Sequence, residues 1–187
     1  MQKKVKNIIR VPVDGMLIAI YIVLSLSFMT LNAGGLKITF EHFPVVLCAI
    51  LYGPIDAMMV GALGELFNQL TTFGLTPTTA LWVLPIVVRG LFVGLYQKSL
   101  KKQMVSQASL KAKTPIIFMI VCIVSGILSS CINTFALYVD SKMFGYYKYQ
   151  MVFGVFGVRI GLSVVTSIII GLVITPVIYA LRKARLA

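Results

Sequence analysis

Residues 114–139, TPIIFMIVCIVSGILSSCINTFALYV, carry no charged side chain and are long enough to cross a membrane as one helix. A spanning helix needs about 20 consecutive, predominantly apolar residues. The whole chain has the same character, because 59% of its 187 residues are hydrophobic and only 12% are charged. A soluble domain carries roughly 45–50% apolar and about 25% charged residues. The composition therefore excludes a soluble domain, a disordered chain and a disulfide scaffold, and it predicts an integral membrane protein.

Five further apolar stretches join this one, so we predict an all-α integral membrane protein with six transmembrane helices in a single domain, residues 1–187. The predicted helices cover residues 13–31, 40–52, 55–73, 79–97, 114–139 and 151–181. The second helix is short and is expected to be tilted or to cross only half of the membrane. Glycine and proline mark the turns, as in Gly53-Pro54. No internal repeat or linker divides the chain.

The lysines and arginines predict the orientation of the helices. If the N-terminus is cytoplasmic, 12 of these 17 residues lie in the N-terminus, the 98–113 loop and the C-terminus, and three lie in outer loops. Positive residues accumulate on the cytoplasmic side of membrane proteins, so both termini are expected in the cytoplasm. The net charge of +12 then indicates contact with anionic membrane lipid and not with nucleic acid.

Residue types that carry chemistry are scarce. One histidine, His42, and three cysteines without a CxxC spacing do not make a metal site, and Cys48, Cys122 and Cys131 are interpreted as small core residues. The sequence contains no P-loop and no close pair of carboxylates. We therefore expect no enzyme, no metal and no cofactor. An autonomous secondary carrier or channel is an alternative, although the two inverted halves that would favour a carrier are not visible.

Four residues stand out inside the predicted helices. A charged side chain at the bilayer centre costs several kcal/mol, with estimates from about 2.5 upward, so each is a functional candidate. Counting about 1.5 Å per residue from the outer helix ends places all four in the outer half of the membrane. They predict a polar substrate-binding pocket open to the outside, formed by Glu65, Arg89, Asn133 and Arg159.

Two arginines against one glutamate predict a positive surplus and an anionic ligand. Arg89 ranks before Arg159 as the ligand of a carboxylate, because Trp82 lies seven residues earlier on the same face and can cover the bound molecule. Asn68 shares a face with Glu65. Alternatively, Glu65 pairs with an arginine only to hold helices together.

Three outer stretches, residues 32–40, 73–79 and 140–150, combine glycines, hydroxyls and aromatic residues and are expected to form a lid. Tyr147 in the third stretch is a candidate for stacking on the ligand. The tyrosines of that stretch also fit an aromatic belt at the membrane interface.

Small residues recur at helical spacing. Gly15 and Ala19 in the first predicted helix, and Gly154, Gly157 and Gly161 in the last, allow backbones to approach closely. Ala57 and Gly61 form the same pattern in the third. Such pairs serve internal packing or, for Gly15 and Ala19, a docking surface for another membrane protein.

Four stretches now carry a resemblance to a known family: ITFEHFP at 38–44, LYGP at 51–54, VGALGEL at 60–66 and GLTPTT at 74–79. With the six helices and cytoplasmic termini, the chain resembles the substrate-binding S components of energy-coupling factor (ECF) vitamin transporters, of the folate/pantothenate type. The resemblance implies a multi-pass protein of the bacterial cell membrane that binds a vitamin between its outer loops and helices four to six.

The resemblance also implies partners. S components dock on a transmembrane coupling subunit (EcfT-type) driven by two ABC-type ATPases (EcfA-type), which hydrolyse the ATP, and they deliver their vitamin by toppling in the membrane. Small residues of the first helix contact the coupling subunit, a position that Gly15 and Ala19 match here. With an anionic ligand expected, pantothenate ranks first. Folate is the first alternative, followed by pyridoxine or hydroxymethylpyrimidine held by Glu65.

Overall fold

The computed structural model is a bundle of α-helices, and it describes residues 2–27, 40–104 and 114–183. The predicted all-α fold with six helices is confirmed, and no strand occurs in these ranges. The elements are α1 (Gln2–Ser27), α2 (His42–Leu51), α3 (Pro54–Thr72), α4 (Thr79–Met104), α5 (Thr114–Met143), a π-helical turn η3 (Gln150–Gly154) and α6 (Phe156–Lys183). Most of the first predicted lid stretch, residues 32–39, lies outside the described residues.

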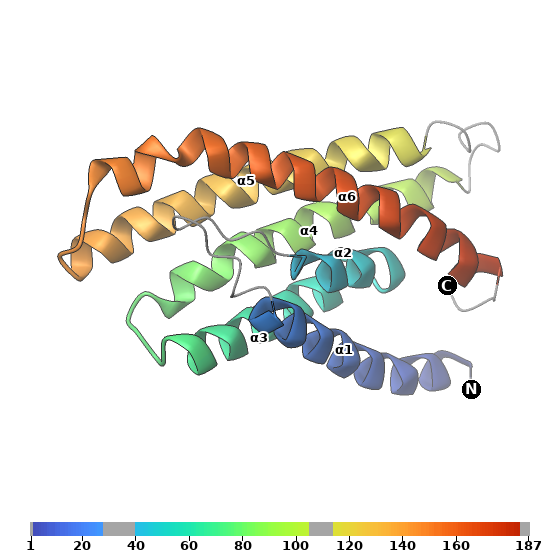
Figure 1. Cartoon of the computed structure of the whole chain (residues 1–187). Helices are drawn as coiled ribbons and strands as arrows, with labels where there is room; N and C mark the ends of the chain where they lie inside the picture. The colour runs from blue at the N-terminus through green and yellow to red at the C-terminus, as the bar shows by residue number, and fades with distance from the viewer. Residues whose placement is uncertain (1, 28–39, 105–113, 184–187) are drawn as a thin grey trace.

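The long helices run roughly side by side, with the start of α1 and the end of α6 at one end of the bundle (Figure 1). We call this the cytoplasmic end, following the distribution of lysine and arginine. The α3–α4 and α5–α6 connections lie at the opposite, outer end. Four helices, α1, α4, α5 and α6, are long and apolar enough to cross a membrane. Helix α1 begins about 11 residues before the predicted span, because its basic first turns continue the helix beyond the apolar stretch.

The short helix α2 fills the centre of the bundle over only part of its length. Its ten residues span about 15 Å, half of a bilayer core of about 30 Å, as expected for a half-crossing helix. Its end lies beside Arg10 of α1, toward the cytoplasmic end, and Val45, Val46 and Ala49 are fully buried in the apolar core. Among the described residues, no such central helix lies in the outer half of the bundle.

Glycines bring α1, α3 and α4 into close contact. A Cβ added at Gly94 would overlap the Cα of Pro54, and one at Gly64 would lie 2.6 Å from the ring of Tyr21. The small residues of α3 therefore serve internal packing. The prediction of close packing is wrong for Gly157 and Gly161, because a Cβ there would meet nothing within 4 Å.

We expect Gly94→Ala to destabilise the bundle, because the added methyl group meets the backbone of α3 and not a flexible side chain. Overpacking of this kind typically costs about 1–3 kcal/mol. The matched control is Gly157→Ala, which enters open space. Thermal unfolding of the detergent-solubilised proteins should give a lower midpoint for Gly94→Ala alone. Equal midpoints would contradict the tight α3–α4 contact.

The cysteines divide into two groups. Cys48 and Cys122 are buried, as expected for core residues, whereas Cys131 is exposed on α5. The core interpretation is thus wrong for Cys131, because an apolar stretch in a membrane helix has a face that turns toward lipid as well as one that turns inward.

Candidate ligand-binding site

A cavity of about 1130 Å³ occupies the outer half of the bundle, where α2 is absent. Ligand pockets in proteins usually measure roughly 300–1,000 Å³, so a vitamin-sized molecule fits. Aromatic side chains line it together with polar ones. The polar and charged lining residues are Glu41, His42, Glu65, Asn68, Gln69, Thr72, Thr76, Ser129, Ser130, Asn133, Asp140, Gln150, Arg159, Ser163 and Thr166.

Helical periodicity explains the polar walls. In α3, Glu65, Asn68, Gln69 and Thr72 follow one another at the spacing of a single helical face, and all four line the cavity. Similar stripes on α5 and α6 face the same space. The structure thus brings together five of the predicted site residues in the cavity lining: Glu65, Asn68, Trp82, Asn133 and Arg159. Their role in binding stays a prediction.

Glu65 is held by neutral donors from two helices. Its carboxylate accepts hydrogen bonds from the Tyr21 hydroxyl on α1 at 2.7 Å, from Gln69 Nε2 at 2.7 Å and from Asn68 Nδ2 at 3.2 Å. The predicted pairing of Glu65 with an arginine is wrong within the described part of the chain, where the ion pair found joins Arg10 to Asp56. Three donors fix the direction of the carboxylate, so it presents a defined acceptor to the cavity.

Arg159 faces the cavity from α6. Its Nη2 donates to the backbone carbonyl of Met151 at 3.0 Å, in the π-helical turn η3. Its Nη1 is buried and has no hydrogen-bond partner among the described residues. A buried donor without a partner is costly, and a water, an ion or a ligand can satisfy it. Irregular π-helical turns are frequent at functional sites. Nη1 is therefore a donor available to a ligand.

Arg89 does not line the cavity. It lies one turn deeper than the lining residues Pro85 and Ile86, is 1% exposed, and donates from Nη2 to the Ser167 hydroxyl of α6 at 2.9 Å. The structure thus places Arg159, and not Arg89, at the cavity, while the choice of the arginine that binds the ligand stays a prediction. Trp82 lines the cavity, whereas Arg89, seven residues further along α4, lies below the cavity floor.

Tyr147 also lies outside the lining. Its ring packs edge-on against Tyr138 with 5.6 Å between centroids, and the Lys142 ammonium lies 4.3 Å from its centroid. The neighbouring Tyr146 lines the cavity instead. Residue spacing cannot distinguish two adjacent tyrosines in a connection between helices.

Comparison with known families decides what kind of protein this is. Residues 10–182 match the family described as ECF transporter, substrate-specific component. The chain belongs to this family. No curated protein matches it. Members are membrane-embedded subunits of transporters that bind substrate and are not enzymes, which agrees with the apolar helices and the cavity.

The mouth of the S component's cavity contains an acidic contact that was not predicted as a site. Asp140 at the outer end of α5 accepts hydrogen bonds from the hydroxyls of Thr78 and Tyr146, and thereby joins the α3–α4 and α5–α6 connections. Desolvation and the bond to Asp140 raise the pKa of Tyr146 to about 12, so at neutral pH its hydroxyl keeps its proton and donates. The helical spacing of Asp140 with Ser129 and Asn133 is the sequence feature that predicts its place at the cavity.

The charge of the S component's cavity differs from the prediction. Three carboxylates line it, those of Glu41, Glu65 and Asp140, against one guanidinium, that of Arg159. The expected positive surplus is therefore wrong for the described lining. Arg89 lies below the floor, and the charges of Glu41 and Asp140, which stand at helix ends, were not included in the predicted balance.

Proposed function

We propose that this S component captures a vitamin from outside the cell in the outer cavity and delivers it inward by toppling while docked on a coupling subunit driven by two ABC-type ATPases. One observation carries the proposal: a large polar cavity reaches the outer connections of an otherwise apolar bundle. Family membership supports the importer assembly over the alternative of an autonomous carrier or channel.

The charge of the lining suggests which vitamin. A carboxylate-rich wall repels an anion and favours a neutral or weakly basic molecule that donates hydrogen bonds. Trp82 supplies a flat apolar surface for a ring, Glu65 an acceptor and Arg159 Nη1 a donor. A small heteroaromatic vitamin such as pyridoxine or hydroxymethylpyrimidine has all three complements, so we place this class first.

Pantothenate is the second candidate, because the unpartnered Nη1 of Arg159 matches a carboxylate. It no longer ranks first, since the positive surplus that favoured it is absent from the described cavity. Folate fits the cavity volume but would bring two carboxylates to an acidic wall.

Binding of a vitamin panel to the purified protein tests this order. We expect pyridoxine or hydroxymethylpyrimidine to bind at least about tenfold more tightly than pantothenate or folate, a difference of about 1.4 kcal/mol. Isothermal titration in detergent gives the affinities. Tightest binding of pantothenate or folate would show that Arg159 dominates over the carboxylates and would overturn the proposed class.

The docking surface proposed for the coupling subunit lies on α1. Gly15 and Ala19 are exposed, and nothing lies within 4 Å of the position a Cβ would take at Gly15. The neighbouring Val11, Met16 and Val23 are also exposed, which makes this face apolar. Small residues on an apolar helix face suit close approach by a helix of the coupling subunit.

A further inference from the structure

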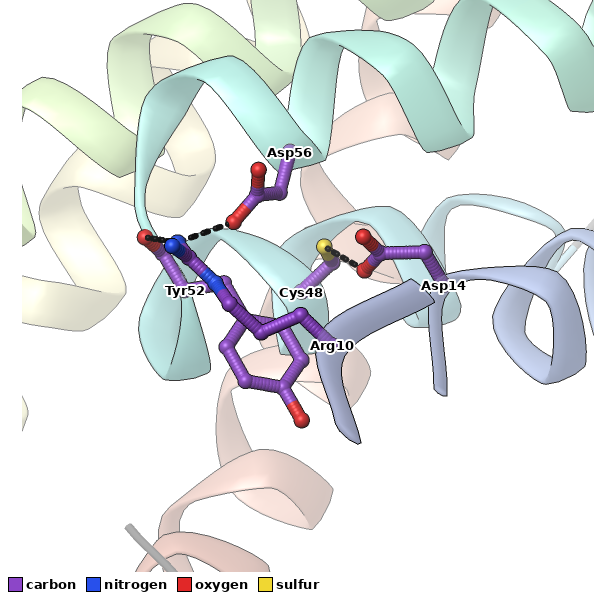
Figure 2. A network of polar contacts seen from close by, with 5 residues as sticks. All are labelled: Arg10, Asp14, Cys48, Tyr52 and Asp56. Carbon is purple, nitrogen blue, oxygen red and sulfur yellow. Dashed lines mark hydrogen bonds and ion pairs between the residues drawn. The ribbon is translucent and has the colours of Figure 1, made fainter. Parts of the chain in front are cut away.

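A group of polar contacts ties α1 to the α2–α3 turn at the cytoplasmic end (Figure 2). The Arg10 guanidinium of α1 forms an ion pair with Asp56 in the first turn of α3. Its Nη2 also donates to the carbonyl of Tyr52 at 3.2 Å, and the guanidinium carbon lies 5.4 Å from the centroid of the Tyr52 ring. One side chain thus contacts the end of α2 and the start of α3 together.

A second contact lies one turn further along α1. The Cys48 thiol of α2 donates to the Asp14 carboxylate at 3.5 Å. Near the cavity, Tyr21 packs against Gly64 and donates to Glu65. Helix α1 is therefore attached through Arg10 and Asp14 at a cytoplasmic level and through Tyr21 at the level of the cavity, and Arg10 and Tyr21 are about 16 Å apart along its axis. The proposed docking residues, Gly15 and Ala19, lie between these levels and face away from the bundle.

The attachment through Arg10 matters because α1 buries its side chains further along: among its residues from Arg10 onward, the first buried one is Leu17, about two turns later. Much of the α1 surface is exposed, with Val11 74%, Met16 65% and Val23 60% exposed. Apolar side chains gain little from packing against another helix when lipid is the alternative, so polar contacts and close packing determine how membrane helices associate. Arg10 supplies both a charge-assisted bond and a ring contact at the free end of α1.

We propose that Arg10 is a positioning residue: its pairing with Asp56 and Tyr52 holds the cytoplasmic half of α1 at the angle that presents Gly15 and Ala19 to the coupling subunit. The inference rests on the proposed docking and adds to it a determinant outside both the cavity and the contact face. It implies that docking is impaired when the pair is broken, while the cavity still binds its ligand.

A charge-reversal series tests this. Arg10→Asp places a carboxylate beside Asp56, Asp56→Arg places two cations together, and the double variant restores the pair with its charges exchanged. Lys98→Asp is the matched control, because Lys98 is exposed near the same end of the bundle and its change removes the same positive charge. Affinity is measured in detergent with the vitamin of the panel (pyridoxine, hydroxymethylpyrimidine, pantothenate or folate) that binds the parent protein most tightly. Uptake and co-purification with the coupling subunit and ATPases are measured in cells.

We expect Arg10→Asp to lower uptake and co-purification about tenfold relative to Lys98→Asp, with ligand affinity within about threefold of the parent. The double variant should recover uptake to within about threefold. Asp56→Asn removes the pair without adding a like charge, and it gives the same test if Arg10→Asp does not insert. Uptake by Arg10→Asp and Asp56→Asn equal to that of Lys98→Asp, or no recovery in the double variant, overturns the inference. The double substitution of Gly15 and Ala19 with tryptophan distinguishes a failure of the docking proposal from a failure of this inference. If α1 is not the docking surface, that variant leaves uptake intact.

Discussion

Arg159→Gln is expected to weaken ligand binding by about tenfold or more. A hydrogen bond to a charged group contributes about 1.5–3 kcal/mol, which corresponds to roughly 10- to 150-fold in affinity. Arg159 is the only arginine or lysine in the described cavity lining, and its buried Nη1 has no partner among the described residues. Glutamine is shorter and uncharged, so it replaces neither the reach nor the charge. Isothermal titration on the folded, detergent-solubilised variant measures the loss.

Two variants control this experiment. Lys148→Gln removes a cation from the outer connection, where the side chain is exposed, and should change affinity by less than about threefold, or roughly 0.7 kcal/mol. Arg89→Gln removes the buried guanidinium below the cavity and should mainly lower the unfolding midpoint, because the Ser167 hydroxyl loses its donor. If folded Arg89→Gln lost binding while Arg159→Gln kept it, Arg89 would be the ligand-binding arginine.

The second large effect is expected on transport and not on binding. Replacing both Gly15 and Ala19 with tryptophan should lower uptake by about 30-fold or more, because a bulky pair prevents the close helix approach that small residues allow. Both positions are exposed, so the new side chains do not disturb the bundle itself. Ligand affinity of the isolated protein should remain within about threefold of the parent. Uptake in cells that express the coupling module, together with titration in detergent, separates the two effects.

The matched control is Gly157→Trp, which introduces the same side chain at another open glycine, on the exposed face of α6. It should transport at nearly the parental rate. Normal uptake by the Gly15 and Ala19 variant would mean that this face of α1 contacts lipid. Equal losses in both variants would point to a general effect of bulky residues on the outside of the bundle.

Local properties of the sequence were enough to predict that this is a membrane protein and where its helices lie. Uninterrupted apolar stretches such as 114–139 predict membrane helices because a helix satisfies its own backbone in lipid, whatever its neighbours are. The end of the short second helix was predictable from Gly53-Pro54, because proline and glycine act on the adjacent backbone. Helical periodicity also placed Glu65 and Asn68 on one face, and the cavity lies on that face.

The composition of the cavity depended on tertiary structure. Spacing along α4 predicts Trp82 and Arg89 on one face, yet of the two only Trp82 lines the cavity. How deep the cavity reaches along α4 depends on where the neighbouring α2 begins, and the sequence of α4 does not contain that information. Asp140 meets Thr78, 62 positions earlier, so the acidic mouth could not be read from either segment alone. The contact of Arg10 with Asp56 is of the same kind, since it joins helices 46 positions apart.

The sequence by itself determined the membrane environment, the number of helices and their polar faces. Its short motifs, such as VGALGEL at 60–66, also determined the resemblance to S components. These follow from interactions within a turn or two of helix. Only the tertiary structure decided which arginine borders the cavity, the sign of the charge around it and how α1 is attached. Each of those depends on the relative depth and rotation of different helices, and side chains far apart in the chain set these quantities jointly when they pack.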